Sequence, residues 1–159
     1  MPRRYWLLKT EPEAFSIDDL LAAPDRTTGW SGVRSYQARN LLRDELKKGD
    51  RALVYHSNAK PSAVVGEAEV VREGYPDPTQ FDRRDGHYDP DSPPAAPRWF
   101  QVDVRGVRKF ARPVPLEEIK ASRELSRMPL VQRGQRLSVQ PVDEADYRRI
   151  VALAKARKG

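Results

Sequence analysis

The sequence has 159 residues, no cysteine and two histidines, with 38% hydrophobic and 33% charged residues. This length suits one domain with its own core, and the absence of cysteine excludes disulfides, thiolate nucleophiles and zinc–thiolate sites. No apolar run is long enough to cross a bilayer and the N-terminus does not read as a signal peptide, so we expect a cytoplasmic monomer without membrane contact. The net charge of +6 weakly favours a polyanionic partner.

The first 50 residues predict a strand and two helices. Residues 4–9 predict the strand. The helix after it begins at Ser16, a typical N-cap residue with Asp19 three positions further on. Apolar residues at helical spacing predict a longer helix over 35–48, and Gly49 is expected to end it in the left-handed conformation.

From residue 51 onward the sequence predicts mainly short strands, because Val, Ala and aromatic residues alternate with polar ones. Gly66 inside one of them indicates a bulge or a close approach of two backbones. The predicted strands are 51–57, 63–72, 99–104, 107–110 and 136–139, and the predicted helices are 116–121 and 144–157, the second capped by Asp143 after a short turn over 122–128.

The segment between Glu73 and Pro97 is rich in proline and has almost no periodicity. Such a loop within one domain is either disordered or functional. Because it carries several aromatic residues, we predict an ordered flap packed across the domain. The fold class that follows is mixed α/β: a small, mainly antiparallel β-barrel with peripheral helices, forming one domain over 1–159 with 152–159 as a basic tail.

Three polar runs stand beside predicted strand ends. Lys9, Thr10 and Glu11 form either a surface ion pair or the polar edge of a pocket. Trp30, in a glycine-rich loop, either plugs the end of the barrel or lines a ligand site. Residues 55–58 combine an aromatic ring with amide and hydroxyl groups, which suits a flat heterocycle. A capped strand end explains this run better when it is taken alone, but three such runs beside strand ends shift the balance toward a site.

Motifs for metal binding, nucleotide hydrolysis, dinucleotide binding and nucleophilic catalysis are missing from the sequence. We therefore predict no metal, no cofactor and no catalytic residue. A missing motif does not by itself exclude an enzyme.

Taken together, the runs closely resemble the EVE domain family over about residues 4–151. The motifs that carry the resemblance are WLLKTEP (6–12), WSGVRSYQARN (30–40), YHSN (55–58), YPDPTQFD (75–82), YDP (88–90), PRW (97–99) and RLSVQPV (136–142). The resemblance implies a PUA-like fold, related to YTH and ASCH domains. It also implies non-catalytic binding of a modified base, a cytosine in DNA with RNA as the alternative, turned out of the helix into a pocket.

The resemblance also implies roles for individual residues. Trp30 becomes a wall of the base pocket, and Arg34, Arg39 and Arg136 become contacts to phosphates near its mouth. Ser31 and Ser35 stand where relatives often have an acidic residue and Asn, so the preferred base stays open. The remaining predicted ligand-binding residues are Tyr55, His56, Ser57 and Asn58 along the rim, Lys9, Thr10 and Glu11 as polar contacts, and Ser138 and Gln140 on another side.

An alternative function is hydrolysis of a nucleoside or small molecule. Some ASCH relatives use Lys, Thr and Glu for such a reaction, and Lys9, Thr10 and Glu11 supply these residue types. Neighbours on one strand point to alternate sides, however, so Thr10 cannot converge with the other two on one atom. The binding function is therefore the stronger hypothesis.

Overall fold

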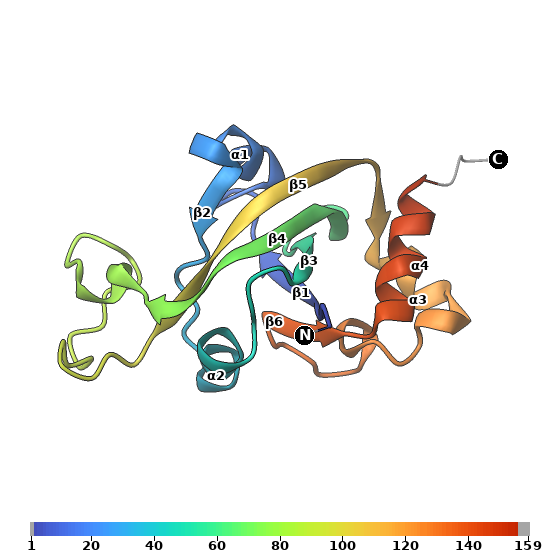
Figure 1. The fold of residues 1–159 in the computed structure, drawn as a ribbon. Helices are drawn as coiled ribbons and strands as arrows, with labels where there is room; N and C mark the ends of the chain where they lie inside the picture. The colour runs from blue at the N-terminus through green and yellow to red at the C-terminus, as the bar shows by residue number, and fades with distance from the viewer. Residues whose placement is uncertain (1, 156–159) are drawn as a thin grey trace.

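The computed structural model describes residues 2–155 as one six-stranded sheet flanked by four α-helices (Figure 1). The strands are β1 (Tyr5–Thr10), β2 (Thr27–Gly29), β3 (Arg51–His56), β4 (Ala63–Pro76), β5 (Phe100–Pro115) and β6 (Val139–Val142). The helices are α1 (Ile17–Ala22), α2 (Tyr36–Asp44), α3 (Leu116–Ala121) and α4 (Glu144–Lys155), with short 3₁₀ turns η1 (Pro24–Arg26), η2 (Pro78–Phe81), η3 (Arg123–Leu125) and η4 (Pro129–Val131).

The order of the strands in the sheet is β2-β5-β4-β3-β1-β6. Only β1 and β3 pair in parallel, whereas the other four pairings are antiparallel. The predicted mixed α/β fold with mainly antiparallel strands is thereby confirmed. The edge strand β6 contains Pro141, which an edge tolerates because one side of the strand makes no ladder hydrogen bonds.

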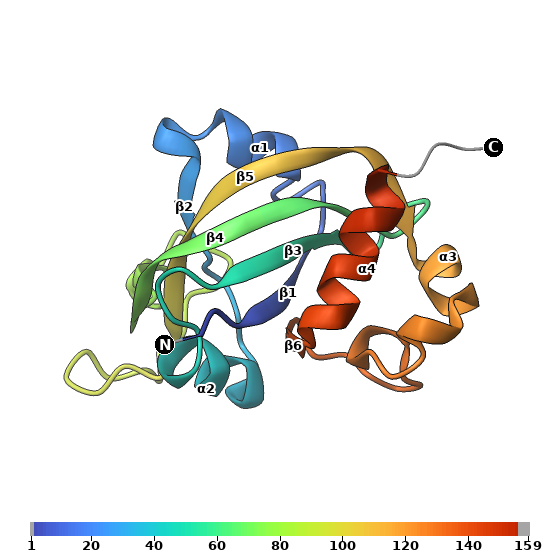
Figure 2. The same cartoon turned by 45° about the vertical axis from the view of Figure 1, so that its right-hand side comes forward.

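The sheet has a hydrophobic cluster on each face. Alternate residues of β1 divide between them, so that Trp6 and Leu8 join one cluster and Leu7 joins the other. The first cluster is covered by α1 and α2, and the second by α3 and α4, as Figure 2 shows from the side of α4. Trp30 belongs to the first cluster, so the site described below is built on that face.

Several predicted boundaries differ from the structure. The strands predicted at 99–104 and 107–110 are one continuous β5, because Gly106 stays in the ladder, pairing with Ala68, where a side chain would collide with Leu21. β2 was not predicted, since three residues are too few to show a period. β6 lies three residues later than predicted, and α2 ends earlier, at Asp44, although Gly49 does have a positive φ of 95°.

The remaining predicted elements are confirmed in kind. Ser16 caps α1, and its hydroxyl accepts a hydrogen bond from the Asp19 N–H in the predicted capping box. The tail predicted at 152–159 begins inside α4, and its residues 156–159 lie outside the described part of the chain.

The flap between β4 and β5 is ordered, as predicted, but it lies beyond the outer ends of these strands rather than across the domain (Figure 1). Its centre is the buried Gln80, whose side-chain amide donates to the carbonyls of Asp77 and Trp99. The amide oxygen of Gln80 accepts from the Ser92 hydroxyl and from the Trp99 N–H. The side chain of Gln80 thus makes four hydrogen bonds, and these hold together a loop whose regular structure is limited to the short turn η2.

Within residues 2–155, no helix is long and apolar enough to span a membrane. The same part of the chain contains no cluster of three or more potential metal ligands.

Candidate functional site

A cavity of about 540 Å³ opens where β1 and β2 end on the face of the first hydrophobic cluster. Its volume lies within the roughly 300–1,000 Å³ that is typical of small-molecule sites. Five segments meet around it: the end of β1 with the turn to α1, the end of β2, the loop leading into α2, the flap, and the residue just before β6. The lining residues are Lys9, Thr10, Glu11, Ala14, Phe15, Thr28, Gly29, Trp30, Ser31, Gly32, Val33, Arg34, Ser35, His87 and Ser138.

Trp30 forms the aromatic wall of this cavity. Its N–H donates to the Val102 carbonyl at 2.8 Å and so extends the pairing of β2 with β5 by one residue. Its ring meets the ring of Phe15 edge-on, with centroids 6.3 Å apart. The side chain is only 6% exposed, so Trp30 is at once a core residue and a lining residue. Trp30 therefore packs in the core and also faces the cavity, and its contact with a base stays a prediction.

The polar edge comes from the end of β1. The N–H of Lys9 donates to the Ser138 carbonyl, and its ammonium lies 5.9 Å from the centre of the Tyr55 ring. Burial lowers the pKa of Lys9. The Thr10 hydroxyl donates to the Phe15 carbonyl, and Glu11 accepts a short hydrogen bond from the Asn58 amide. Two of these three side chains are thus already engaged within the chain.

A buried carboxylate, Asp77, fixes the flap to the loop that carries Trp30. It accepts hydrogen bonds from the Gly32 N–H at 2.8 Å and from the Arg34 guanidinium at 3.1 Å. On the flap itself it accepts from both the N–H and the hydroxyl of Thr79. Burial alone would raise the pKa of Asp77, but these hydrogen bonds outweigh it and hold that pKa below its ordinary value. The charged form therefore holds the wall of the cavity together.

Arg34 completes this connection. Its guanidinium donates to the His87 carbonyl at 3.1 and 2.7 Å and to the Thr79 hydroxyl at 3.0 Å. It also lies over the Trp99 ring, 5.3 Å from the ring centre. Because its donors are directed into the flap, Arg34 connects the flap to the loop that carries Trp30. The predicted contact of Arg34 with a phosphate stays a prediction.

The run 55–58 lies beside this cavity but does not line it. β3 runs parallel to β1, with Tyr55 opposite Lys9 and His56 opposite Thr10. The Tyr55 side chain is buried in the second cluster, and the His56 Nε2 atom accepts from the Ile17 N–H at 3.1 Å. Ser57 donates its N–H to the Thr10 carbonyl. The structure thus places this run next to the end of β1 in the sheet, and direct ligand contact by it stays a prediction.

The two residues predicted on the other side differ in their surroundings. Ser138 lines the cavity. Gln140 does not, since it lies opposite Leu7 in the ladder and is fully buried, with its amide donating to the Leu137 carbonyl. A base-contacting role for Gln140 stays a prediction.

The remaining predicted phosphate ligands differ in their surroundings. Arg39 donates to the Arg98 carbonyl at 2.6 Å and lies over the ring of Tyr36. Tyr36 is 53% exposed and stacks on Trp99 with ring centroids 5.0 Å apart. Arg136 is exposed on the loop that leads to Ser138. Of the three arginines, Arg136 therefore has the freest access to a ligand at the cavity mouth.

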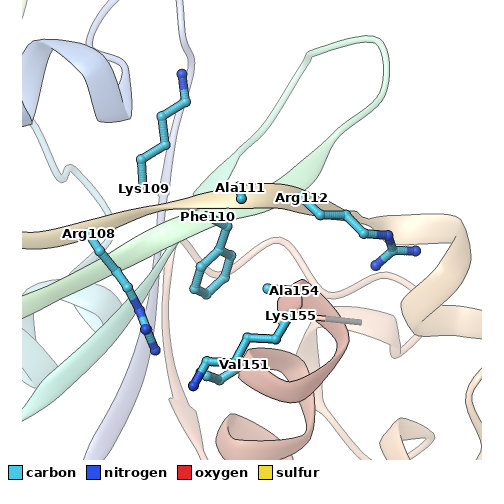
Figure 3. Close-up of a pocket in the computed structure, with 8 residues that line it drawn as sticks. All are labelled: Arg108, Lys109, Phe110, Ala111, Arg112, Val151, Ala154 and Lys155. Carbon is cyan, nitrogen blue, oxygen red and sulfur yellow. The ribbon is translucent and has the colours of Figure 1, made fainter. Parts of the chain in front are cut away.

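A second depression, of about 470 Å³, lies between β5 and α4 (Figure 3). Phe110 points from β5 toward Val151 on α4, and the lining also includes basic residues, of which Lys109 points to the other side of β5. Three of these cations are already paired, Arg108 with Glu67, Lys109 with Asp18 and Arg112 with Glu118. The residues that line this depression include no uncharged hydrogen-bonding side chain, whereas several serine and threonine residues line the Trp30 cavity.

Sequence reasoning missed Phe15 and His87 as lining residues. Phe15 directly precedes the Ser16 cap of α1, a position where an apolar residue ordinarily packs against its own helix. His87 belongs to the flap, whose order was predicted but whose predicted position across the domain was wrong. The aromatic content of the flap was the available signal.

The match to family models agrees with this architecture: residues 4–153 match the EVE domain, and the chain belongs to that family. Among its relatives, thymocyte nuclear protein 1 from mouse is 45% identical over 94% of this chain and 73% of the relative. The chicken protein of the same name is 44% identical over 96% of this chain and 69% of the relative.

Solved structures show the same fold. Human THYN1 protein, in complex with DNA containing 5-methylcytosine, matches with a TM-score of 0.91 and 41% identity over 98% of this chain and 99% of that one. A hypothetical protein from Leishmania major matches with a TM-score of 0.91 and 42% identity over 97% and 96%. A ZmASCH mutant protein from Zymomonas mobilis, 12% identical over 95% and 99% with a TM-score of 0.58, shares the fold alone.

Proposed function

We propose that this protein is a non-catalytic reader of modified cytosine in DNA. The observation that carries the proposal is that the chain matches, over nearly its whole length, a protein whose structure was solved in complex with 5-methylcytosine DNA. The cavity of about 540 Å³ beside Trp30 supports it. The base turns out of the duplex and stacks on Trp30. Unstacking and unpairing cost a few kcal/mol, which stacking and hydrogen bonds in the cavity offset.

The arrangement favours binding over hydrolysis. A hydrolase of the alternative type needs Lys9, Thr10 and Glu11 free to act on one atom. The Thr10 hydroxyl donates instead to a carbonyl of its own chain, and Glu11 is held by Asn58. We therefore propose that the cavity binds a base without transforming it. Incubation with a panel of modified nucleosides, including N4-acetylcytidine, is expected to leave every compound intact.

The binding test compares duplexes that differ in one methyl group. Fluorescence anisotropy would measure the dissociation constants of labelled duplexes carrying either 5-methylcytosine or cytosine at the same position. We expect tighter binding of the methylated duplex. Ser31→Trp places a large ring in the cavity and should abolish this preference, whereas Ser126→Trp, on an exposed turn away from the cavity, should not.

Trp30 itself needs a mild substitution, because it is also part of the core. Trp30→Ala is expected to cost about 3–5 kcal/mol of folding stability, which would obscure its effect on binding. Trp30→Phe keeps an aromatic face with a smaller area and should weaken binding of the methylated duplex severalfold. Equal binding of both duplexes by the wild-type protein would refute the proposed function.

A further inference from the structure

His87 reaches the cavity from the flap and lies directly against Gly32. A Cβ atom on Gly32 would lie 2.8 Å from both Cε1 and Nε2 of the histidine ring. The His87 ring therefore fits against this loop only because Gly32 has no side chain. Gly32 also has a positive φ of 84°. Both residues line the cavity that holds Trp30. The edge of His87 that faces this wall is the edge with Nε2.

The protonation pattern of this ring follows from its neighbour Asp85. The Nδ1 atom lies 3.0 Å from the Asp85 carboxylate, which also accepts the His87 backbone N–H at 2.8 Å. Because a carboxylate can only accept, Nδ1 must carry the proton. In the neutral ring Nε2 is then a hydrogen-bond acceptor. Within residues 2–155, Nε2 makes no hydrogen bond.

The backbone of His87 is held as firmly as its side chain. Arg34 donates twice to the His87 carbonyl, and Asp77 holds both Arg34 and Gly32. The acceptor on the flap and the wall with Trp30 are thus tied to one buried carboxylate. Such fixed placement is what a residue that selects among ligands requires, because a mobile acceptor would adjust to either kind of partner.

We infer that Nε2 of His87 reads the amino group of the bound base and restricts the site to amino bases. This inference rests on the proposed function. Thymine and 5-methylcytosine carry the same methyl group but differ at position 4, where thymine has a carbonyl and cytosine an amino group. An acceptor at His87 pairs with the amino hydrogens and opposes the carbonyl oxygen. A site built to satisfy such a group rejects the ligand that lacks it.

The experiment compares binding of 5-methylcytosine and thymine without a difference in base pairing. Each base is placed opposite an abasic site in otherwise identical duplexes, and dissociation constants are measured by anisotropy. The wild-type protein should prefer 5-methylcytosine about tenfold, the size of one unsatisfied hydrogen bond. His87→Phe keeps a flat ring without an acceptor and should reduce the preference below about twofold. His87→Gln, which can present an amide oxygen, should retain part of it.

A preference that survives in His87→Phe would overturn the inference, since the ring would then serve only as packing. If the wild-type protein prefers 5-methylcytosine to cytosine but binds thymine equally well, the His87 inference fails and the proposed function stands. If it distinguishes none of the three bases, the proposed function fails.

Asp85 provides a readout that a purely structural role would not change. The sequence contains two histidines, so the side-chain nitrogens of His87 can be assigned by NMR. Wild-type His87 should carry its proton on Nδ1. Asp85→Asn can donate to Nδ1, which shifts the proton to Nε2 and turns the acceptor into a donor, and the preference for 5-methylcytosine should fall with it. A shifted proton with an unchanged preference would contradict the inference.

Discussion

The carboxylate of Asp77 accepts a hydrogen bond from the backbone N–H of Gly32 at 2.8 Å, across 45 residues of sequence. Asp77 begins the flap, and Gly32 follows Trp30 in the wall of the cavity. This one bond, with the Arg34 ion pair beside it, sets the distance between the two sides of the site. The stability of the flap and the shape of the base cavity therefore depend on the same buried charge.

Asp77→Asn tests this dependence. The substitution removes the charge that Arg34 and three N–H or O–H donors surround, and we expect a loss of about 2–3 kcal/mol in the free energy of unfolding. Urea denaturation followed by tryptophan fluorescence would measure it, with Asp91→Asn as a control on an exposed part of the same flap. A loss equal to that of the control would show that Asp77 does not hold the flap.

The same variant has a pH signature. Since the pKa of Asp77 is lowered by folding, its contribution to stability is present above the ordinary value of 3.8 and is lost as the pH falls through the folded pKa. Asp77→Asn should remove this part of the acid-induced loss. The two proteins should therefore differ most at neutral pH and converge in strong acid.

His56 gives a pH dependence in a different range. Burial lowers the pKa of His56 most, Asp18 raises it in part, and Lys109 lowers it further. The neutral ring accepts the Ile17 N–H at the start of α1, and a protonated ring could not. The stability that this bond contributes is therefore present above the ordinary value of 6.5 and is lost as the pH falls through the lowered pKa.

His56→Gln keeps an acceptor but cannot titrate. Between about pH 7.5 and about pH 5.5 the wild-type protein should lose stability, measured as the midpoint of urea unfolding, whereas the variant should lose less. Identical losses in both proteins would mean that His56 carries no pH-dependent part of the folding energy.

Gly66 tests how closely β4 and β5 approach each other. A Cβ atom at this position would lie 2.5 Å from the Arg108 carbonyl oxygen, a backbone atom that cannot turn aside. Gly66→Ala is expected to lower the free energy of unfolding by about 2 kcal/mol or more. Gly86→Ala is the matched control, because the corresponding Cβ meets nothing within 4 Å. Equal stability of the two variants would contradict the close packing at Gly66.

The sequence predicted what depends on local pattern. Ser16 and Asp19 predict the start of α1, and Gly66 predicts the close approach of β4 to β5. Both predictions were possible because each signal lies within a few neighbouring residues. The sequence did not predict which strands pair with each other when they are far apart in the chain. His56 lies beside Thr10 because β3 pairs in parallel with β1, and no spacing in the run 55–58 reveals that pairing.

The residues that line the cavity likewise fall into those that the sequence could predict and those that it could not. Trp30 was recognised because no helix or strand period explains a tryptophan between glycines. His87 was missed, since the tertiary contacts of the flap with Gly32 and Arg34 are what bring it to the wall. A polar residue far along the chain joins a site through contacts that composition cannot show.

Arg136 tests the electrostatic part of binding. Its exposed side chain stands on the loop next to Ser138, and a phosphate contact there would release about one counterion from DNA. Arg136→Gln should weaken binding to methylated and unmethylated duplexes alike and reduce the slope of log Kd against log salt by about one. Lys120→Gln, on the exposed side of α3, should leave the slope unchanged. The same slope in all three proteins would exclude this contact.

The most direct measurement of the central claim is a map of where DNA binds. Backbone amide NMR spectra of the ¹⁵N-labelled protein, titrated with a duplex containing one 5-methylcytosine, report which residues change their surroundings. We expect the largest shifts at Gly29–Gly32 and at His87, and smaller shifts with the unmethylated duplex. Shifts centred instead on Arg108–Arg112 and Val151–Lys155, the depression between β5 and α4, would contradict it.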